Sequence, residues 1–468
     1  EYFLNNAIIS AQQDPNIAER AFVLYWKTAA RQHLSTGIAG GTYNDDWTKE
    51  YWRYSSEWLN HANTAIEIAT IKEAQGTAQV YNENLIQVSR IWRAYLMSEL
   101  SDNFGAIPIN AFQGVNPEFN STKDVYYFLL EELKDASSKI DVSINRTDKL
   151  KKLDPAYEYD WEKWMRYANS MRLRLAMRIA VVDPAKAKTE FEAAVATNKL
   201  IIATDQTFQV AERPGWDALT GVMSREWNGQ VLSATLNNLY VGLGGIKSEV
   251  QLDPSLHASI KPDNYAGKHM LGHYSVKTND PAAGYFFDGL PNSIDPRAYK
   301  TFYIPGNFNS PEWSNYPSYG TDAGKTMVNF NPVAGFNKDT LKVDVKNTWS
   351  TTAAGDFGAK AAANGIRSVQ IGKIPGLAQK FRNSTNKRIF FANWETYFLL
   401  AEAAVKGWNT GTTAQTAYEN GVKANFEYMG VSQFATEYLS STNYNRVGTS
   451  VSFTHTSEPG QSKNMSFV

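Results

Sequence analysis

The stretch from Asp160 to Ala180, DWEKWMRYANSMRLRLAMRIA, constrains the fold of this chain more than any other segment. Its apolar residues recur at steps of three and four, which is the spacing of one helix face; they are Trp161, Trp164, Met165, Ala168, Met171, Leu175 and Ile179. The other side carries Lys163, Arg166, Ser170, Arg174 and Arg178. The pattern predicts an amphipathic helix with one packed face. It indicates a scaffold element and assigns no chemistry to the helix itself.

Helical spacing recurs through the first 200 residues and again near the end of the chain. The predicted helices are Ile17–Leu34, Tyr51–Glu73, Asn82–Leu100, Ser121–Lys139, Tyr159–Val182, Pro184–Thr197, Asn393–Trp408 and Thr413–Tyr428. Asp183 and Pro184 together form a typical helix start. The short connections predict antiparallel helix pairs of tetratricopeptide-like packing, although no clean repeat of about 34 residues is present.

The sequence changes in character between Asp205 and Arg382, which hold 11 of the 17 Pro and 19 of the 31 Gly. Long helices are therefore not expected there. Short strands are expected at Gly284–Phe287, Ala298–Tyr303 and Ser368–Ile371, where aromatic and β-branched residues cluster. The prediction is a mostly α single body over residues 1–468, with a helical scaffold at 1–204 and 390–440 and a large irregular insertion at 205–389.

The composition excludes several classes of function. The net charge is −1, so no general positive field exists to attract nucleic acid. The longest nearly apolar stretch, Tyr397–Val405, is too short to span a bilayer. The absence of cysteine removes disulfides, zinc–thiolate sites and thiol nucleophiles. Because the sequence starts at Glu1 and not at Met, we expect an upstream leader or lipid attachment segment.

Four separated segments resemble the SusD family, also called RagB/SusD-like, of nutrient-binding outer-membrane lipoproteins. They are the Asp160–Ala180 helix, SDNFGAIPINAF at Ser101–Phe112, NWETYFLLAEAAVKG at Asn393–Gly407 and AYENGVKANFEYMG at Ala417–Gly430. Their order and spacing agree with the family across about Leu4 to Ser440. The lipidated N-terminal Cys and the final basic, tryptophan-containing segment of such proteins are missing from this sequence.

The resemblance implies a tetratricopeptide-like scaffold with a loop-rich, ligand-presenting region at 205–389. It also implies a cell-surface location in the outer membrane of a Gram-negative bacterium, through an N-terminal lipid anchor. The expected partner is a SusC-like TonB-dependent transporter, to which the protein delivers its ligand. No cofactor, metal or catalytic residue is expected.

Two aromatic loops are the candidate ligand site, because flat rings stack on sugar faces while neighbouring polar groups bind hydroxyls. The first loop, Gly41–Lys49, contributes Tyr43, Asn44, Asp45 and Trp47. The second, Pro305–Gly320, contributes Trp313, Tyr316 and Tyr319. Both occupy loop positions similar to those at which the family assembles ligand sites. On this hypothesis, Trp47→Ala or Trp313→Ala abolishes polysaccharide binding at an unchanged melting temperature; the alternative is that these rings are buried.

Other functions remain open beside glycan capture. A peptide could replace the glycan, since related proteins are associated with either nutrient. A glycoside hydrolase would need two carboxylates at a defined separation, for which Asp45, Asp46 and Glu312 are candidates. His269 and His273 could share a helical face toward a metal, but Gly272 lies between them and no acidic ligand is near. A purely structural interaction protein is the last alternative.

Overall fold

The computed structural model describes residues 1–13, 26–32, 45–110, 117–211, 230–269, 285–314, 327–330, 340–351, 372–382 and 386–456. Its contacts divide the chain into two compact units. The helical unit comprises residues 1–18, 45–213 and 387–428, and the loop-rich unit comprises 19–44, 214–386 and 429–468. The prediction had placed residues 19–44 and 429–440 in the scaffold, whereas the contacts group them with the loop-rich unit. That the two units form a single body stays a prediction.

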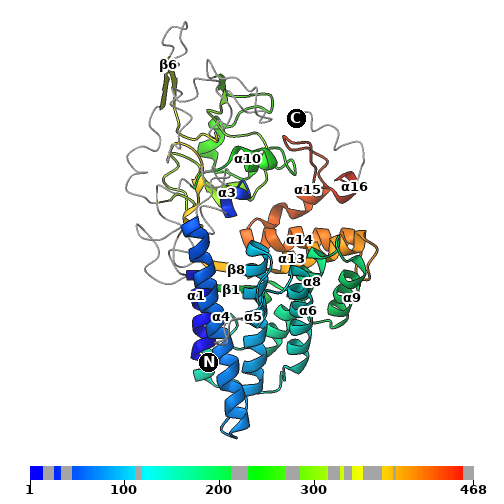
Figure 1. Ribbon diagram of the computed structural model, residues 1–468. Helices are drawn as coiled ribbons and strands as arrows, with labels where there is room; N and C mark the ends of the chain where they lie inside the picture. Colours follow the sequence, from blue (N-terminus) through cyan, green and yellow to red (C-terminus); the bar gives the residue numbers. More distant parts are fainter. Residues whose placement is uncertain are drawn as a thin grey trace. The chain divides into compact units, whose positions relative to one another are not determined.

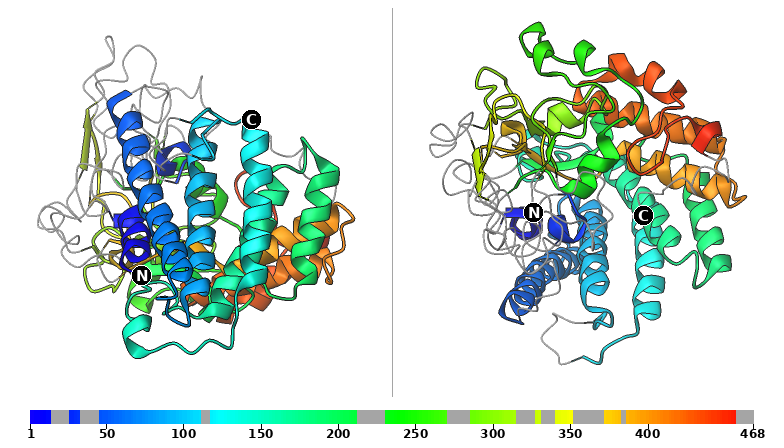
Figure 2. Two further views of the ribbon diagram at one scale, coloured as in Figure 1. Left: turned by 60° about the horizontal axis from the view of Figure 1, so that its bottom comes forward. Right: turned by 90° about the horizontal axis from the view of Figure 1, so that it is seen from above.

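The helical unit is built from long helices that pack side by side in chain order (Figure 1). Its helices are α1 (Tyr2–Gln13), α4 (Asp45–Ala74), α5 (Asn82–Phe104), α6 (Thr122–Lys139), α7 (Asp148–Lys151), α8 (Trp161–Arg178), α9 (Pro184–Ala196), α13 (Asn393–Val405) and α14 (Ala414–Met429). Contacts run from α1 to α4, then through α5, α6 and α8 to α9, and α13 packs on α8. The same row of helices is visible from the other directions in Figure 2. The predicted mostly helical fold is confirmed in this unit.

Local sequence signals start several of these helices. The side chains of Ser121, Asp160 and Asp183 each accept a hydrogen bond from a backbone N–H of the first turn, at 3.2, 3.1 and 3.1 Å. Such caps satisfy N–H groups that have no partner within the helix. Pro184 occupies the first turn of α9, where its missing N–H costs nothing.

The α8 helix differs from its prediction because it is buried on both sides. Ser170, which was placed on the outer side, is fully buried and accepts a hydrogen bond from the backbone of Ile201 at 2.9 Å. Arg174 binds both carboxylate oxygens of Glu395 on α13, at 2.5 and 2.7 Å. The polar side of α8 is therefore an interface with other elements, which periodicity alone cannot distinguish from a solvated face.

One two-stranded antiparallel sheet completes the core of the helical unit. Strand β1 (Phe208–Ala211) pairs with β8 (Lys387–Phe391), so segments far apart in sequence meet beside α5 and α8. Phe208 is fully buried; its ring stacks on Tyr167 at 4.2 Å and on Trp92 at 5.7 Å. The insertion therefore leaves and re-enters the scaffold through a strand pair that aromatic packing fixes.

The loop-rich unit contains only short elements among its described residues. They are α3 (Lys27–Ala29), α10 (Ala234–Tyr240), α11 (Ala298–Thr301), α15 (Ala435–Ser440), α16 (Phe453–Thr456) and the 3-10 turns Ser248–Val250, Pro254–Ser259, Gln379–Phe381 and Ser432–Phe434; the helical unit adds a 3-10 turn at Thr204–Gln206. Antiparallel pairs join β2 (Lys268–His269) to β3 (Tyr285–Phe286), β4 (Phe302–Tyr303) to β7 (Gly376–Leu377), and β5 (Met327–Phe330) to β6 (Thr340–Val343). Its core includes Trp349, whose ring lies 4.8 Å from Tyr299 and whose N–H donates to Asn237 at 2.9 Å.

Several predicted boundaries need correction. Segment 298–303 was predicted as a strand but begins as α11 and is extended only at Phe302–Tyr303. Helix α13 ends at Val405, three residues before the predicted end at Trp408. Of the predicted helix 17–34, the described part includes α3 alone, and the predicted strand 368–371 lies outside the described residues. His269 lies in strand β2 and not in a helix; His273 is outside the described residues.

No helix in the described ranges is both long and apolar enough to cross a membrane.

Candidate ligand-binding site

The first predicted loop is partly helical. Helix α4 begins at Asp45, so Asp45 and Trp47 lie in its first turn and not in a loop. Consecutive acidic residues suit this position, because the positive end of the helix dipole favours negative charge. Tyr43 and Asn44 lie outside the described residues, as do the side chains of Asp45 and Trp47. Their role in binding stays a prediction.

A group of aromatic rings lies just after this helix start and was missed by the sequence argument. Trp52 on α4 stacks on Phe119 with ring centres 6.2 Å apart, and it meets Phe104 edge-on at 5.0 Å. Phe119 is 63% exposed. We call Trp52, Phe104 and Phe119 the α4–α5 aromatic group. It presents a solvent-facing ring on the helical unit.

The backbone around Phe119 is fixed by hydrogen bonds. Asn120 donates its N–H to the carbonyl of Ile107 at 3.0 Å and accepts the N–H of Ile109 through its side chain at 2.9 Å. These bonds join the chain before α6 to the turn after α5. The exposed ring is therefore held on a defined support.

The second predicted loop is described from Pro305 to Ser314, and we call this part the Phe308 loop. Trp313 is only 6% exposed; its indole meets Tyr303 at 4.8 Å and Phe308 at 4.9 Å, both edge-on. Phe308 itself is 49% exposed. The structure thus favours the packed alternative for Trp313 and places Phe308 at the surface of the same loop. Tyr316 and Tyr319 lie outside the described residues.

Polar contacts hold the Phe308 loop against its unit. Glu312 accepts hydrogen bonds from Lys300 at 2.8 Å and from the hydroxyl of Ser310 at 2.5 Å, while its carbonyl accepts the N–H of Gln379 at 3.1 Å. The hydroxyl of Ser314 donates to the carbonyl of Leu377 at 2.7 Å. A ring on a pre-ordered loop binds a ligand without the entropy cost of ordering that loop.

The protonation of Glu312 bears on the hydrolase alternative. Burial would raise the pKa of Glu312, but the hydrogen bonds from Lys300 and Ser310 outweigh it and hold the pKa below its ordinary value. A glycosidase general acid needs a raised pKa, because it must carry a proton at neutral pH. Glu312 is therefore an anchor of the loop and is unsuited to that catalytic role.

The exposed rings that the structure describes lie in or near the two predicted loops, and the predicted site itself stays a prediction. Phe308 lies in the predicted second loop, and Trp52 lies five residues after Trp47. The signal for Phe308 was its place between two Asn residues in a segment rich in Gly and Pro, which is a typical setting for an exposed ring. No sequence signal separated the exposed Phe308 from the buried Trp313, because that depends on Tyr303 in a different element.

The fold is that of a mostly helical protein with a loop-rich insertion. A family model described as SusD-like, Susd and RagB outer membrane lipoprotein, matches residues 4–271 and 323–466. The chain belongs to this SusD-like family. The resemblance in the four segments is thereby confirmed.

Solved structures agree with the fold. A SusD homologue from Parabacteroides distasonis matches with a TM-score of 0.68 and 22% identity, over 97% of this chain and 77% of that one. A chitin-binding SusD homologue from Flavobacterium johnsoniae matches with a TM-score of 0.58 and 22% identity, over 95% and 73%. A further chitin-binding protein matches with a TM-score of 0.61 and 17% identity, over 93% and 78%. No curated protein matches the sequence.

Proposed function

We propose that this protein captures a glycan at the cell surface and passes it, uncleaved, to a partner TonB-dependent outer-membrane transporter. The observation that carries the proposal is the half-exposed ring of Phe308, held by Trp313 on an ordered loop at a position where the family presents ligand sites. Aromatic rings of this kind stack on the apolar faces of sugars. Family membership supports the outer-membrane location and the transporter as partner.

Capture without cleavage also agrees with the chemistry of the loop. The carboxylate of Glu312 is neutralised by Lys300 and has a lowered pKa. Stacking contributes about 0.5–1.5 kcal/mol per ring beyond area burial, which gives modest affinity and rapid release to a transporter.

The direct test is electrophoresis of the protein through native gels that contain a soluble polysaccharide. The panel includes glycol chitin, because two proteins of similar fold are described as chitin-binding. We expect Phe308→Ala and Phe119→Ala to reduce retardation. The control is Phe3→Ala. Phe3 lies on α1 with a ring that is 41% exposed, and it is distant in sequence from the α4–α5 aromatic group and from the Phe308 loop.

Two results would contradict the proposal. Equal retardation of all three variants would show that neither the α4–α5 aromatic group nor the Phe308 loop binds the glycan. Binding of a peptide library with no retardation by any polysaccharide would move the protein to the peptide-binding alternative. The transporter is tested by co-expression with candidate TonB-dependent transporters from the same genome, followed by co-purification in detergent.

A further inference from the structure

A separate cavity of about 420 Å³ lies in the loop-rich unit, away in sequence from the Phe308 loop. The lining residues fall in four short segments, 241–247, 262–265, 287–293 and 443–446. Its volume falls in the range of small-molecule sites. None of the predicted site residues lines it.

One wall of the cavity depends on the glycines of the GLGG turn, residues 242–245. Gly242, Gly244 and Gly245 all have positive φ, at 84°, 78° and 69°. A Cβ on Gly242 would lie 2.7 Å from the carbonyl oxygen of Tyr444, and one on Gly245 would lie 2.2 Å from the side-chain nitrogen of Asn443. The glycines therefore let residues 443–446 lie directly on this turn, which gives the cavity its shape.

The lining combines aromatic rings with amide groups. Tyr265 is partly exposed; its ring packs on Phe287 at 5.8 Å, and its hydroxyl donates to Asp288 at 2.5 Å. Burial and this hydrogen bond raise the pKa of Tyr265 to about 12, so the hydroxyl stays protonated. Tyr444 is 36% exposed, and Asn443 beside it is also exposed. Rings with adjacent amides supply stacking faces and both donors and acceptors.

Two cations, Lys247 and Arg446, and one carboxylate, Asp263, line the cavity. Lys247 lies 3.8 Å from Asp263, which also accepts a hydrogen bond from the amide of Asn292 at 2.8 Å. Asp288 is paired with Lys268 at 3.4 Å. Both carboxylates are thus paired with a lysine, which leaves a cationic ligand little to bind. In the ranges that the structure describes, no cluster of three or more His, Cys, Asp or Glu could hold a metal ion.

We infer that this cavity is a second binding site, for a neutral sugar residue that stacks on Tyr265 or Tyr444 and hydrogen-bonds to Asn292 and Asn443. The choice of a sugar as ligand rests on the proposed function, whereas the cavity and the rings and amides that line it are observed independently of that function. Such a site binds short oligosaccharides by itself and increases the retention of longer chains by multivalency.

The test is ligand-observed saturation-transfer NMR with the whole chain and four disaccharides: chitobiose, cellobiose, maltose and lactose. Tyr265→Ala is compared with Tyr265→Phe, which keeps the ring and loses the hydroxyl bond to Asp288. We expect at least one disaccharide to bind, with affinity lowered about three- to tenfold by Tyr265→Ala and little changed by Tyr265→Phe. Tyr444→Ala is the second variant if Tyr265→Ala does not fold.

The outcomes separate this inference from the proposed function. If polysaccharide retention depends on Phe308 while no disaccharide responds to Tyr265→Ala or Tyr444→Ala, the cavity is not a sugar site and the proposed function stands. If the wild-type protein binds neither polysaccharide nor disaccharide, both fail. If Tyr265→Phe loses as much disaccharide binding as Tyr265→Ala, the ring of Tyr265 does not bind the sugar by stacking.

Discussion

Two aromatic residues five positions apart in one loop have different roles, and contacts outside the loop decide which is which. Trp313 is 6% exposed between Tyr303 and Phe308, whereas Phe308 is 49% exposed. The larger ring stabilises the loop, and the smaller ring is available to a ligand. Replacing each therefore has a different expected result.

We predict that Trp313→Ala lowers the free energy of unfolding by about 3 kcal/mol, the typical cost of removing a large buried ring. Phe308→Ala is expected to cost about 1 kcal/mol, because half of its ring is already in water. Urea denaturation of both variants measures the difference. An unchanged stability of Trp313→Ala would show that the ring is not packed and would return it to the ligand site, as the sequence alone had suggested.

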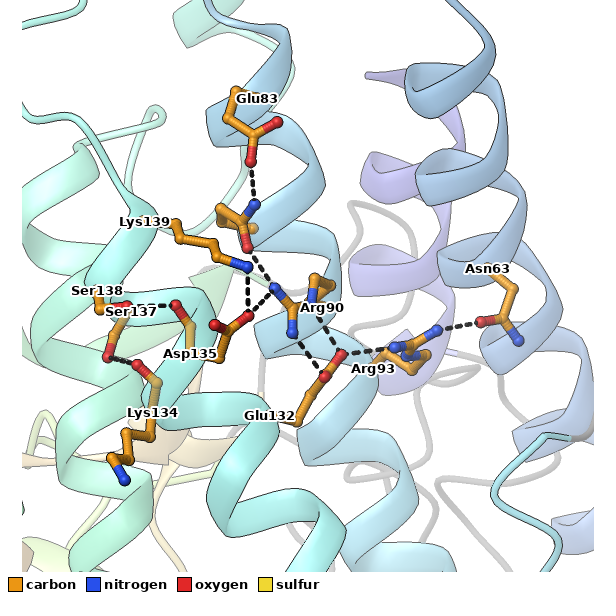
Figure 3. Close-up of polar contacts among 11 residues, drawn as sticks. Asn63, Glu83, Arg90, Arg93, Glu132, Lys134, Asp135, Ser137, Ser138 and Lys139 are labelled. Carbon is orange, nitrogen blue, oxygen red and sulfur yellow. Dashed lines mark hydrogen bonds and ion pairs between the residues drawn. The ribbon is translucent and has the colours of Figure 1, made fainter. Parts of the chain in front are cut away.

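At the scale of elements, the helices α4, α5 and α6 are joined by ionic contacts as well as by apolar packing (Figure 3). Glu132 on α6 binds Arg90 at 2.8 Å and Arg93 at 2.5 Å, both on α5, and Arg93 also donates to Asn63 on α4 at 2.8 Å. The side chain of Glu132 is 8% exposed. A carboxylate so placed is stable only with its cations, so the network fixes how α6 lies against α5.

The acid stability of the helical unit should report this network. Burial tends to raise the pKa of Glu132, but the bonds and charges of Arg90 and Arg93 bring it below the ordinary 4.5. The folded state therefore favours the ionised form. Its stabilisation is fully present above about pH 4.5 and is lost as the pH falls through the lowered folded value.

We predict that Glu132→Gln lowers the free energy of unfolding by about 2 kcal/mol at pH 7. Below pH 4.5 the variant should lose less stability than the wild type, because the titrating carboxylate is gone. Chemical denaturation from pH 7 to pH 3 measures both effects. The control is Glu57→Gln, whose partner Arg53 lies at 2.7 Å on the exposed side of α4 and whose own side chain is 52% exposed. A wild-type acid profile in Glu132→Gln would mean that other carboxylates determine acid unfolding.

The turn at residues 242–245 is the second element for which we predict the effect of a substitution on stability. A Cβ on Gly244 would lie 2.0 Å from the ring of Tyr438, in addition to the strain of its positive φ. Gly411 has a similar φ of +69° with no atom within 4 Å. Comparing Ala at both positions separates backbone strain from packing.

We predict that Gly411→Ala costs about 1 kcal/mol and Gly244→Ala about 2–3 kcal/mol, since the second also displaces a buried ring. Thermal unfolding of the two variants shows directly which of them is less stable. Equal destabilisation would show that Tyr438 moves aside at no cost and that the approach of residues 438–446 to the turn is not tight.

For the whole molecule, the arrangement is a helical unit that supplies rigidity and a loop-rich unit that supplies surface. The α4–α5 aromatic group and the Phe308 loop each present one exposed ring from a supported backbone. Rings presented in this way suit the glycan capture that we propose.

We predict that the purified chain retards in polysaccharide gels and releases no reducing sugar from the same polysaccharides over a day. A reducing-end assay with a known hydrolase as positive control measures this. If the wild-type protein releases reducing sugar and Glu312→Gln does not, the hydrolase alternative is restored.

Local sequence patterns identified the family and most of the long helices, although α1 was not among the predicted ones. Helix starts at Ser121, Asp160 and Asp183, and the apolar stripe of α8, depend on contacts within a few residues, so periodicity and capping predict them. The family segments identify the scaffold for the same reason, since each is a local pattern. The predicted loop positions for a ligand site also came from this resemblance.

Only the tertiary structure decided which residues of those segments face solvent. Trp313 is buried because Tyr303 lies against it, Ser170 because α8 has neighbours on both sides, and the cavity exists because the glycines of residues 242–245 admit a segment 200 residues further along the chain. Exposure in a region rich in Gly and Pro depends on contacts between distant segments. No spacing rule along the chain encodes them, and so the sites are where prediction from sequence ends.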